Sequence, residues 1–177
     1  LGGSNITSDV AIGLKLPNAD AEALKISSGC AMIQKVRRDE LVELPGVGGR
    51  QPRPLRRQHL SEIVEPRAEE IFALMRKEIL RSGYEDSLGA GVVLTGGGAL
   101  LDGLPDLGER VFRLPVRRGG PIGIGGLVEV VNSPAYSTAV GLVIYGARAS
   151  ETVVERQEEA PSAGIIDRVK KYLSEFF

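Results

Sequence analysis

Three consecutive glycines, Gly96, Gly97 and Gly98, form a motif whose backbone could bind a ligand. They follow an apolar, β-branched run at 91–94 that predicts a strand, and they precede a helical pattern over 99–110. Glycines between a strand and a helix bring backbone N–H groups to a helix N-terminus with no Cβ in the way, which suits a nucleotide. A tight β–α turn without a ligand explains the same residues. No Lys-Ser/Thr pair follows, so the turn is not a Walker A loop.

A second candidate is a basic segment over 35–57, which carries seven basic and three acidic side chains in a chain whose net charge is −1. Alternation predicts an edge strand over 40–44, and Gly, Pro and Arg predict a loop over 45–57. No aromatic side chains interleave with the arginines, which argues against single-stranded nucleic acid as a partner. A solvated surface loop is the simple explanation.

The C-terminal residues 164–177 form the clearest pattern. Their apolar side chains fall on one face of a helix: Ile165, Ile166, Val169, Tyr172, Leu173, Phe176 and Phe177. An acidic stretch over 149–163, which we interpret as a linker, separates them from the preceding helical pattern. Packing on the parent domain usually explains such a face, but the linker and the two terminal phenylalanines favour docking on a membrane surface.

The elements that must position these residues alternate between strands and helices, which is typical of an α/β protein. A strand end is predicted at 1–3 and a strand at 111–116. Helices are predicted up to Leu14, over 19–28, over 60–80 and, as a last core helix, from Tyr136. Asn132 or Ser133 is expected to cap the last helix, and Pro66 is expected to kink or divide the third.

Composition excludes several classes of protein. One Cys, Cys30, and one His, His59, supply neither a disulfide nor a Cys-rich zinc site. The near-zero net charge argues against a globally basic nucleic-acid binder, and no apolar run reaches the roughly 18 residues of a membrane-spanning helix. The first residue is Leu1 rather than Met, so we expect a fragment or a processed product.

Five segments resemble the FtsA family of bacterial cell-division proteins, within the actin/Hsp70 ATPase superfamily. The segment over 93–104, around the triple glycine, resembles the adenosine motif of the superfamily. The other four narrow the resemblance to FtsA and occur in the family's order: 1–11, Gly48-Gly49-Arg50, Ile63-Val-Glu-Pro-Arg67 and 136–142. Together with the amphipathic end, the resemblance covers nearly the whole chain.

This resemblance implies the second lobe of an actin-like (ribonuclease H-like) α/β fold with a tethered C-terminal amphipathic helix. A sheet-bearing subdomain is expected at 1–8 and 90–148, and a smaller α/β subdomain at 9–89. The acidic linker over 149–163 and the membrane-targeting helix over 164–177 would follow.

The resemblance also implies ATP as the ligand. Gly96, Gly97 and Gly98 would lie against the adenosine and phosphates, and Gly3 would lie near the phosphates in the inter-lobe cleft. Glu22 and Lys25, neighbours at i and i+3 on one helix face, resemble the pair that touches the ribose and adenine. Without the resemblance, this pair is an ordinary surface ion pair.

The two phosphate loops of the superfamily, one of them an Asp-Gly-Gly-Gly-Thr type sequence, do not occur here. The chain would begin just after the second loop, so Mg²⁺ would be held by residues outside this chain. Phosphoryl transfer depends on positioning and metal, so we expect no measurable ATPase activity from these residues alone.

Partners follow from the same resemblance. In the FtsA family this subdomain binds the acidic tail of the tubulin-like protein FtsZ, which makes Arg50, Arg53 and Arg67 candidates to face its carboxylates. The expected function is an ATP-binding adaptor that self-associates into filaments and tethers FtsZ filaments to the cytoplasmic face of the bacterial inner membrane at the division site. Superfamily alternatives are a pilus-assembly ATP-binding protein, a chaperone and a sugar kinase; the membrane helix argues against the last two.

The membrane prediction can be tested with liposomes. Val169→Glu with Phe176→Glu should abolish co-flotation of the chain with liposomes, because apolar burial must supply most of the binding. Gly164→Glu with Ser174→Glu adds the same two charges away from the apolar face and should leave flotation intact. Unchanged flotation of the first variant would end the membrane hypothesis.

Overall fold

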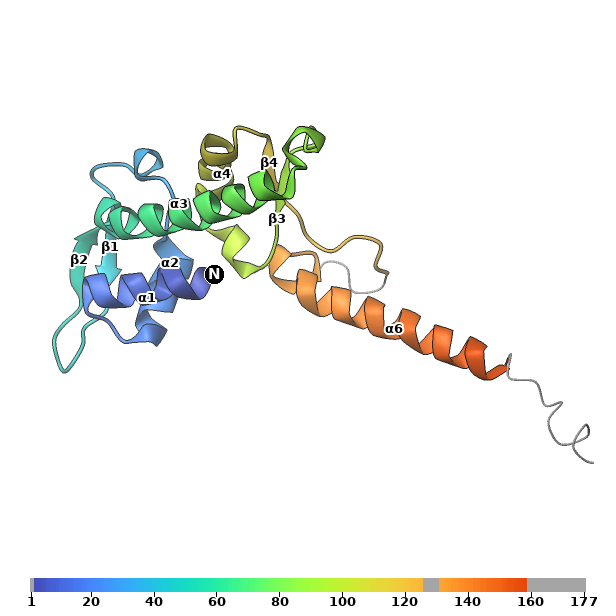
Figure 1. Cartoon of the computed structure of the whole chain (residues 1–177). Helices are drawn as coiled ribbons and strands as arrows, with labels where there is room; N and C mark the ends of the chain where they lie inside the picture. Colours follow the sequence, from blue (N-terminus) through green and yellow to red (C-terminus); the bar gives the residue numbers. More distant parts are fainter. Residues whose placement is uncertain (1, 126–130, 159–177) are drawn as a thin grey trace, which may run out of the picture. The chain divides into compact units, whose positions relative to one another are not determined.

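The computed structural model of this 177-residue chain describes residues 2–125 and 131–158 (Figure 1). The chain divides into two compact units, Leu1–Thr138 and Ala139–Phe177. The predicted subdomain boundaries within the first unit stay predictions. The predicted membrane residues, from Ile165 to Phe177, lie outside the described residues.

Two helices open the first unit, α1 (Gly3–Leu14) and α2 (Asn18–Ser28), and they pack on each other. α1 ends where Lys15 adopts a left-handed conformation, two residues before Pro17, as the sequence predicts. The side chains of Ile6, Val10 and Leu14 recur at the spacing of one helix face and are buried. The apolar spacing thus fixes which side of α1 meets the core.

The longest described helix, α3 (Arg57–Ser82), is a single element with Pro66 inside it. Of the two alternatives expected at Pro66, the division into two helices is therefore wrong, and the kink stays a prediction. Its buried residues include Leu60, Val64 and Ala68, spaced four apart, and their packing on the core outweighs the one backbone hydrogen bond that Pro66 cannot donate. Gly83 ends the helix with φ of 73°.

The basic segment contains a strand that the sequence pattern did not predict. β1 (Leu41–Leu44) pairs antiparallel with β2 (Arg53–Arg56), in the register Leu41 to Arg56 and Leu44 to Arg53. The prediction of a loop is wrong over 53–56, because pairing with β1 makes this arginine-rich run a strand although only Leu55 is apolar. The turn between the strands spans 45–52.

The glycine segment follows β3 (Val92–Leu94), which pairs in parallel with β4 (Val116–Arg118). The predicted helix over 99–110 is instead a 3-10 turn, η3 (Gly97–Leu100), and a separate helix, α4 (Leu104–Phe112). Gly103 divides them with φ of 69°, and a Cβ there would lie 3.2 Å from the Cys30 sulfur. The strand predicted at 111–116 begins only at Val116, because α4 occupies its first residues.

The last described elements are the 3-10 turn η4 (Pro134–Tyr136) and α6 (Ser137–Glu158). Ser133 accepts a hydrogen bond from the Ala135 N–H at 3.4 Å, so it caps the turn η4 that precedes α6 rather than α6 itself. α6 continues over 149–158, where we expected the linker to begin. The expectation that this helix packs on the core stays a prediction.

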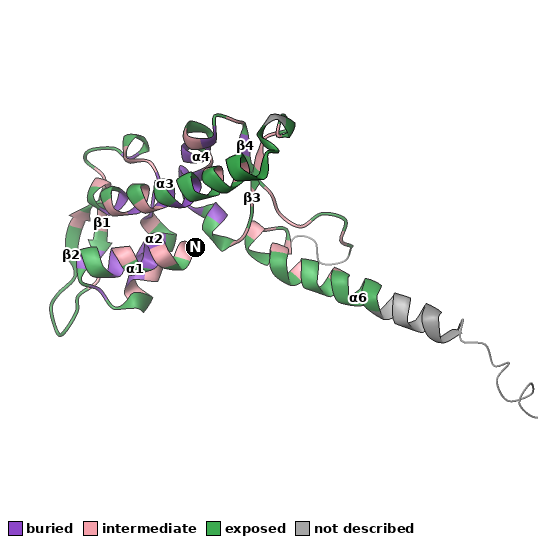
Figure 2. Ribbon diagram, viewed as in Figure 1, coloured by how far each residue is buried: buried purple, intermediate pink, exposed green. Residues whose placement is uncertain are grey.

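The apolar core of the first unit draws on α1, α2, α3 and α4, and Figure 2 marks buried residues on these helices in purple. Leu60, Val64, Val10 and Leu107 are fully buried within it. The rings of Phe72 and Phe112 join α3 to α4 with centroids 5.2 Å apart. None of the described helices is both long and apolar enough to span a bilayer.

A single guanidinium fixes the segment that follows the triple glycine. Arg57, the first residue of α3, donates to the Ser28 carbonyl at 2.8 Å, to Glu40 at 2.9 Å and to Asp102 at 3.0 Å. The Asp102 carbonyl also accepts from the Ala31 N–H at 2.7 Å. The residues from the glycine turn to α4 are thereby tied to the end of α2.

Candidate nucleotide-binding site

A cavity of about 480 Å³ in the first unit brings together five of the six residues that the sequence assigned to a nucleotide site: Gly3, Glu22, Lys25, Gly97 and Gly98. They come from the start of α1, the middle of α2 and the turn η3. Ile26, Leu100 and Ala135 add apolar walls. A cavity of this size, mostly apolar with a few convergent polar groups, is typical of small-molecule sites.

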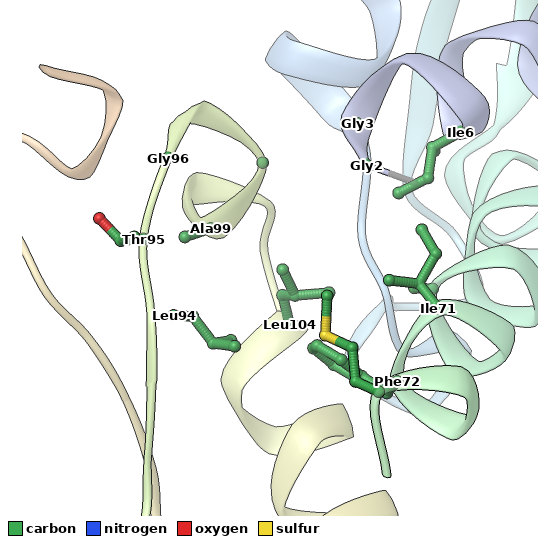
Figure 3. A pocket seen from close by; sticks show the side chains of 13 residues that line it. Gly2, Gly3, Ile6, Ile71, Phe72, Leu94, Thr95, Gly96, Ala99 and Leu104 are labelled. Atoms are coloured by element: carbon green, nitrogen blue, oxygen red, sulfur yellow. The ribbon is translucent and has the colours of Figure 1, made fainter. Parts of the chain in front are cut away.

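The sixth residue, Gly96, lines a neighbouring, more apolar cavity of about 300 Å³. Figure 3 shows this second cavity, with the side chains of Ile6, Ile71, Phe72 and Leu104 gathered beside the glycine turn. The two cavities share Gly3, Ile6 and Gly98. The glycine turn therefore borders two cavities, and the one that Gly96 lines is the more apolar.

The three glycines of the turn differ in conformation and in surroundings. Gly96 has φ of 84°, a left-handed conformation, and its N–H donates to the Pro134 carbonyl at 2.9 Å. Among the residues that the structure describes, none has an atom within 4 Å of a Cβ on Gly97, so this Cβ would project into open space. A Cβ on Gly98 would lie 3.8 Å from the Gly3 nitrogen, so the two backbones approach closely. The first N–H groups of a 3-10 turn have no carbonyl partner within it, which leaves donors for a ligand.

Lys25 is a buried cation, with a residue exposure of 8%. Its ammonium donates to the Glu22 carboxylate at 2.7 Å, to the Thr7 hydroxyl at 3.0 Å and to the Gly3 carbonyl at 3.3 Å. An ammonium has three protons, so these three acceptors satisfy it completely. The pair is therefore not the solvated surface pair that the sequence alone suggests.

Glu22 is the exposed partner, with 44% of its side chain accessible. The hydrogen bonds from Lys25 and then from Thr7 lower the pKa of the Glu22 carboxyl below its ordinary value of 4.5. Both bonds reach Oε2. Among the described residues, Oε1 of Glu22 has no hydrogen-bond partner, so this oxygen is available to a ligand.

Thr7 is the residue of this cluster that the sequence analysis missed as a site residue. It lies one turn after Gly3 on the buried face of α1 and is 7% exposed. The available signal was a polar residue at a core-facing position, three residues before Val10 and seven before Leu14. Its partner Glu22 lies 15 residues away on another helix, so no local pattern links the two.

The three candidate arginines are not equivalent. Arg50 lies in the β1–β2 turn and Arg53 begins β2; both are exposed and form no ion pair among the described residues. Arg67 lies on α3, where it donates through Nε and Nη2 to the two oxygens of Asp9 on α1, and to Glu70. Asp9 therefore occupies two donors of the Arg67 guanidinium. The assignment of Arg67 to a partner stays a prediction.

Comparison of folds places the chain in a class. MreB 5 of Spiroplasma citri bound to AMPPNP superposes with a TM-score of 0.66 over 86% of this chain and 46% of that chain, at 16% sequence identity. The ADP-bound form gives a TM-score of 0.59 over 90% of this chain and 46% of that chain. This α/β chain therefore has the fold of part of an actin-like protein.

Comparison of sequences identifies the family. The family model "Cell division protein FtsA" matches residues 1–141. Cell division protein FtsA of Escherichia coli K12 is 43% identical over 99% of this chain and 44% of its own length. The FtsA of Pseudomonas aeruginosa PAO1 is 39% identical over 98% of this chain and 43% of its own length. The chain belongs to the FtsA family and spans less than half the length of these relatives.

The acid stability of the fold tests the Glu22 cluster. Because the pKa of Glu22 is lowered in the fold, its carboxylate stabilises the protein above about pH 5, and this contribution disappears as the pH falls below 4.5. Glu22→Gln should therefore lower the free energy of unfolding by about 1 kcal/mol at neutral pH and by little in acid, measured by urea titration across pH.

Glu43→Gln removes a carboxylate from exposed β1 and is the matched control, expected within about 0.5 kcal/mol of wild type throughout. A difference between wild type and Glu22→Gln that does not change with pH would contradict the ion-pair geometry.

Proposed function

We propose that this chain is part of an ATP-binding, actin-like cell-division adaptor of the FtsA family. The observation that carries the proposal is the meeting of Gly3, Gly97, Gly98 and Glu22 at one cavity from three separate elements. The nucleotide-bound state of the MreB structures, one with AMPPNP and one with ADP, supports the same reading for the fold. Family membership disfavours the pilus-assembly, chaperone and sugar-kinase alternatives.

The cavity fits the nucleoside end of ATP. Open space above Gly97 admits a ligand to the backbone, the carboxylate of Glu22 can accept from ribose hydroxyls, and the apolar walls of Ile26 and Leu100 suit an adenine ring. Gly3 and Gly98 would approach the phosphates. Bound ATP supplies a triphosphate whose occupancy and hydrolysis can switch an actin-like filament.

Mg²⁺ and the terminal phosphates would be held by residues outside this chain. Among the described residues, no group of three or more His, Cys, Asp or Glu side chains is placed to hold a metal ion. The proposal for this chain is therefore nucleotide binding, and we continue to expect no turnover from it alone.

The proposed protein partner is the acidic tail of FtsZ, and Arg50 and Arg53 are the first candidates to face its carboxylates. Both guanidiniums are exposed on the β1–β2 hairpin and have no ion pair within the described part of the chain that binding would have to break. Arg67 is the third candidate, and it would have to share its guanidinium with Asp9 and Glu70. Arg50 and Arg53 should therefore be mutated before Arg67.

The remaining parts of the proposal concern assembly and place. Filament formation would raise the avidity of many weak membrane helices, since one short amphipathic helix binds reversibly. The C-terminal residues 164–177 would attach the filament to the cytoplasmic membrane at the division site. The two roles are complementary, because FtsZ would be held by one face of the protein and lipid by its tail.

Gly97→Val tests the nucleotide proposal. The isopropyl group would enter open space, so the fold should persist while the cavity loses room for ATP. Titration of ATP into the ¹⁵N-labelled chain should shift the amide signals of Gly3, Glu22, Gly97 and Gly98, and the variant should weaken binding at least about tenfold.

Gly89→Val is the control, since a Cβ there also meets no atom within 4 Å and Gly89 lines neither cavity. ATP that moves no amide of the cavity, or that binds Gly97→Val as well as wild type, would remove the proposal.

Arg50→Glu tests the partner proposal. Its affinity for an acidic FtsZ-tail peptide should fall roughly three- to tenfold, because one exposed attraction becomes a repulsion. Wild-type binding should weaken when salt rises from ~50 to ~200 mM. Arg117→Glu makes the same charge change on β4 and should bind like wild type. Binding that changes neither with salt nor in Arg50→Glu would argue against the β1–β2 hairpin as the binding surface.

A further inference from the structure

We propose that Thr7 is a positioning residue that makes the site select ribonucleotides over 2′-deoxyribonucleotides. Its hydroxyl holds one oxygen of Glu22 so that the other is presented to the vicinal hydroxyls of a ribose. The inference rests on the proposed function, in which the cavity that Glu22 lines holds ATP. It adds a residue and a specificity to that site.

The hydrogen-bond network determines which way the Thr7 proton points. Lys25 donates to the Thr7 oxygen at 3.0 Å, and it also donates to the Gly3 carbonyl at 3.3 Å. The Thr7 hydroxyl has one proton, with the Gly3 carbonyl, at 3.0 Å, and the Glu22 carboxylate as acceptors within reach. The carboxylate is charged and the carbonyl already has Lys25, so the Thr7 proton goes to Glu22.

Glu22 is consequently held at one oxygen by two donors. Oε2 accepts from both Lys25 and Thr7, which come from α2 and α1 and fix the carboxylate plane from two directions. Oε1 is the oxygen without a described partner. A glutamate side chain loses considerable rotamer freedom when it is ordered, and this network orders it before any ligand arrives.

A carboxylate oxygen fixed in this way discriminates by chemistry. It accepts a hydrogen bond from a ribose hydroxyl, and a 2′-deoxyribose offers one hydroxyl fewer, so a charged acceptor loses a partner. Sites built to bond a substrate hydroxyl discriminate strongly against the analogue that lacks it. If Thr7 is removed, only Lys25 holds Glu22, and the carboxylate can turn to meet either sugar.

The competing explanation is that Thr7 only bonds back to the Gly3 carbonyl within α1, as threonines in helices often do. Ser8 provides a matched example, because its hydroxyl donates to the Ser4 carbonyl at 3.1 Å on the exposed side of the same helix. A purely structural role at Thr7 would change stability but not the preference between two sugars.

The experiment measures the dissociation constants of ATP and 2′-dATP for the 177-residue chain by amide-shift titration. Wild type should prefer ATP about tenfold. Thr7→Val, which keeps the shape and removes the hydroxyl, should reduce the preference to about twofold or less. Thr7→Ser, which keeps the hydroxyl, should preserve it, and so should the control Ser8→Ala.

A wild-type preference that survives in folded Thr7→Val overturns the inference and leaves the proposed function intact, as does equal binding of the two nucleotides by wild type. Absence of ATP binding by wild type removes both. Thr7→Ala repeats the test with a smaller side chain. If Thr7→Val and Thr7→Ala both lose the folded spectrum, Thr7 is a stability residue and the positioning role is withdrawn.

Discussion

The buried ammonium of Lys25 is the interaction on which the candidate site depends. A cation out of water is costly unless every proton has an acceptor, and Lys25 finds its three at the start of α1, one turn further along α1, and one turn back on α2. α1 and α2 must therefore pack with these ends together. A Cβ on Gly3 would lie 3.4 Å from the ammonium, at van der Waals contact, so this residue borders the cluster directly.

The same constraint brings the glycine turn to the site. Gly98 lies against Gly3, and the turn is fixed on its other side by the Gly96 N–H on Pro134 and beyond it by Arg57 on Asp102. Among the described residues, a Cβ on Gly97 would have no neighbour within 4 Å, so open space for a ligand remains at this glycine.

Local signals predicted part of this arrangement. α1 and α2 follow from helix formers and from Pro17, and β3 follows from its β-branched run. β2 could not be predicted in this way, because its only apolar side chain is Leu55 and its pairing partner is β1. Where the helix predicted over 99–110 divides, a Cβ on Gly103 would lie 3.2 Å from the Cys30 sulfur, and no window of sequence contains this contact. Tertiary contacts decided each of these differences.

The candidate site shows the same limit residue by residue. The glycines and the Glu22–Lys25 pair were predicted from a family resemblance, and the cavity brings five of the six together. The burial of Lys25 and the role of Thr7 were not predicted, because both depend on the packing of α1 on α2. A surface pair and a buried cluster have the same i, i+3 spacing; only the structure distinguishes them.

The three candidate arginines could not be told apart from the sequence, but they differ in whether their charge is paired within the fold. Arg67 and Asp9 are 58 residues apart, and their two-point contact joins α3 to α1. A guanidinium held in this way contributes to the packing of two helices, and an acidic partner must compete with Asp9 for it. Arg50 and Arg53 lie on a hairpin whose outer face is solvated, where a charge has no internal role. Of the three candidate arginines, Arg50 and Arg53 could therefore pair with an acidic chain at the smallest cost to the fold.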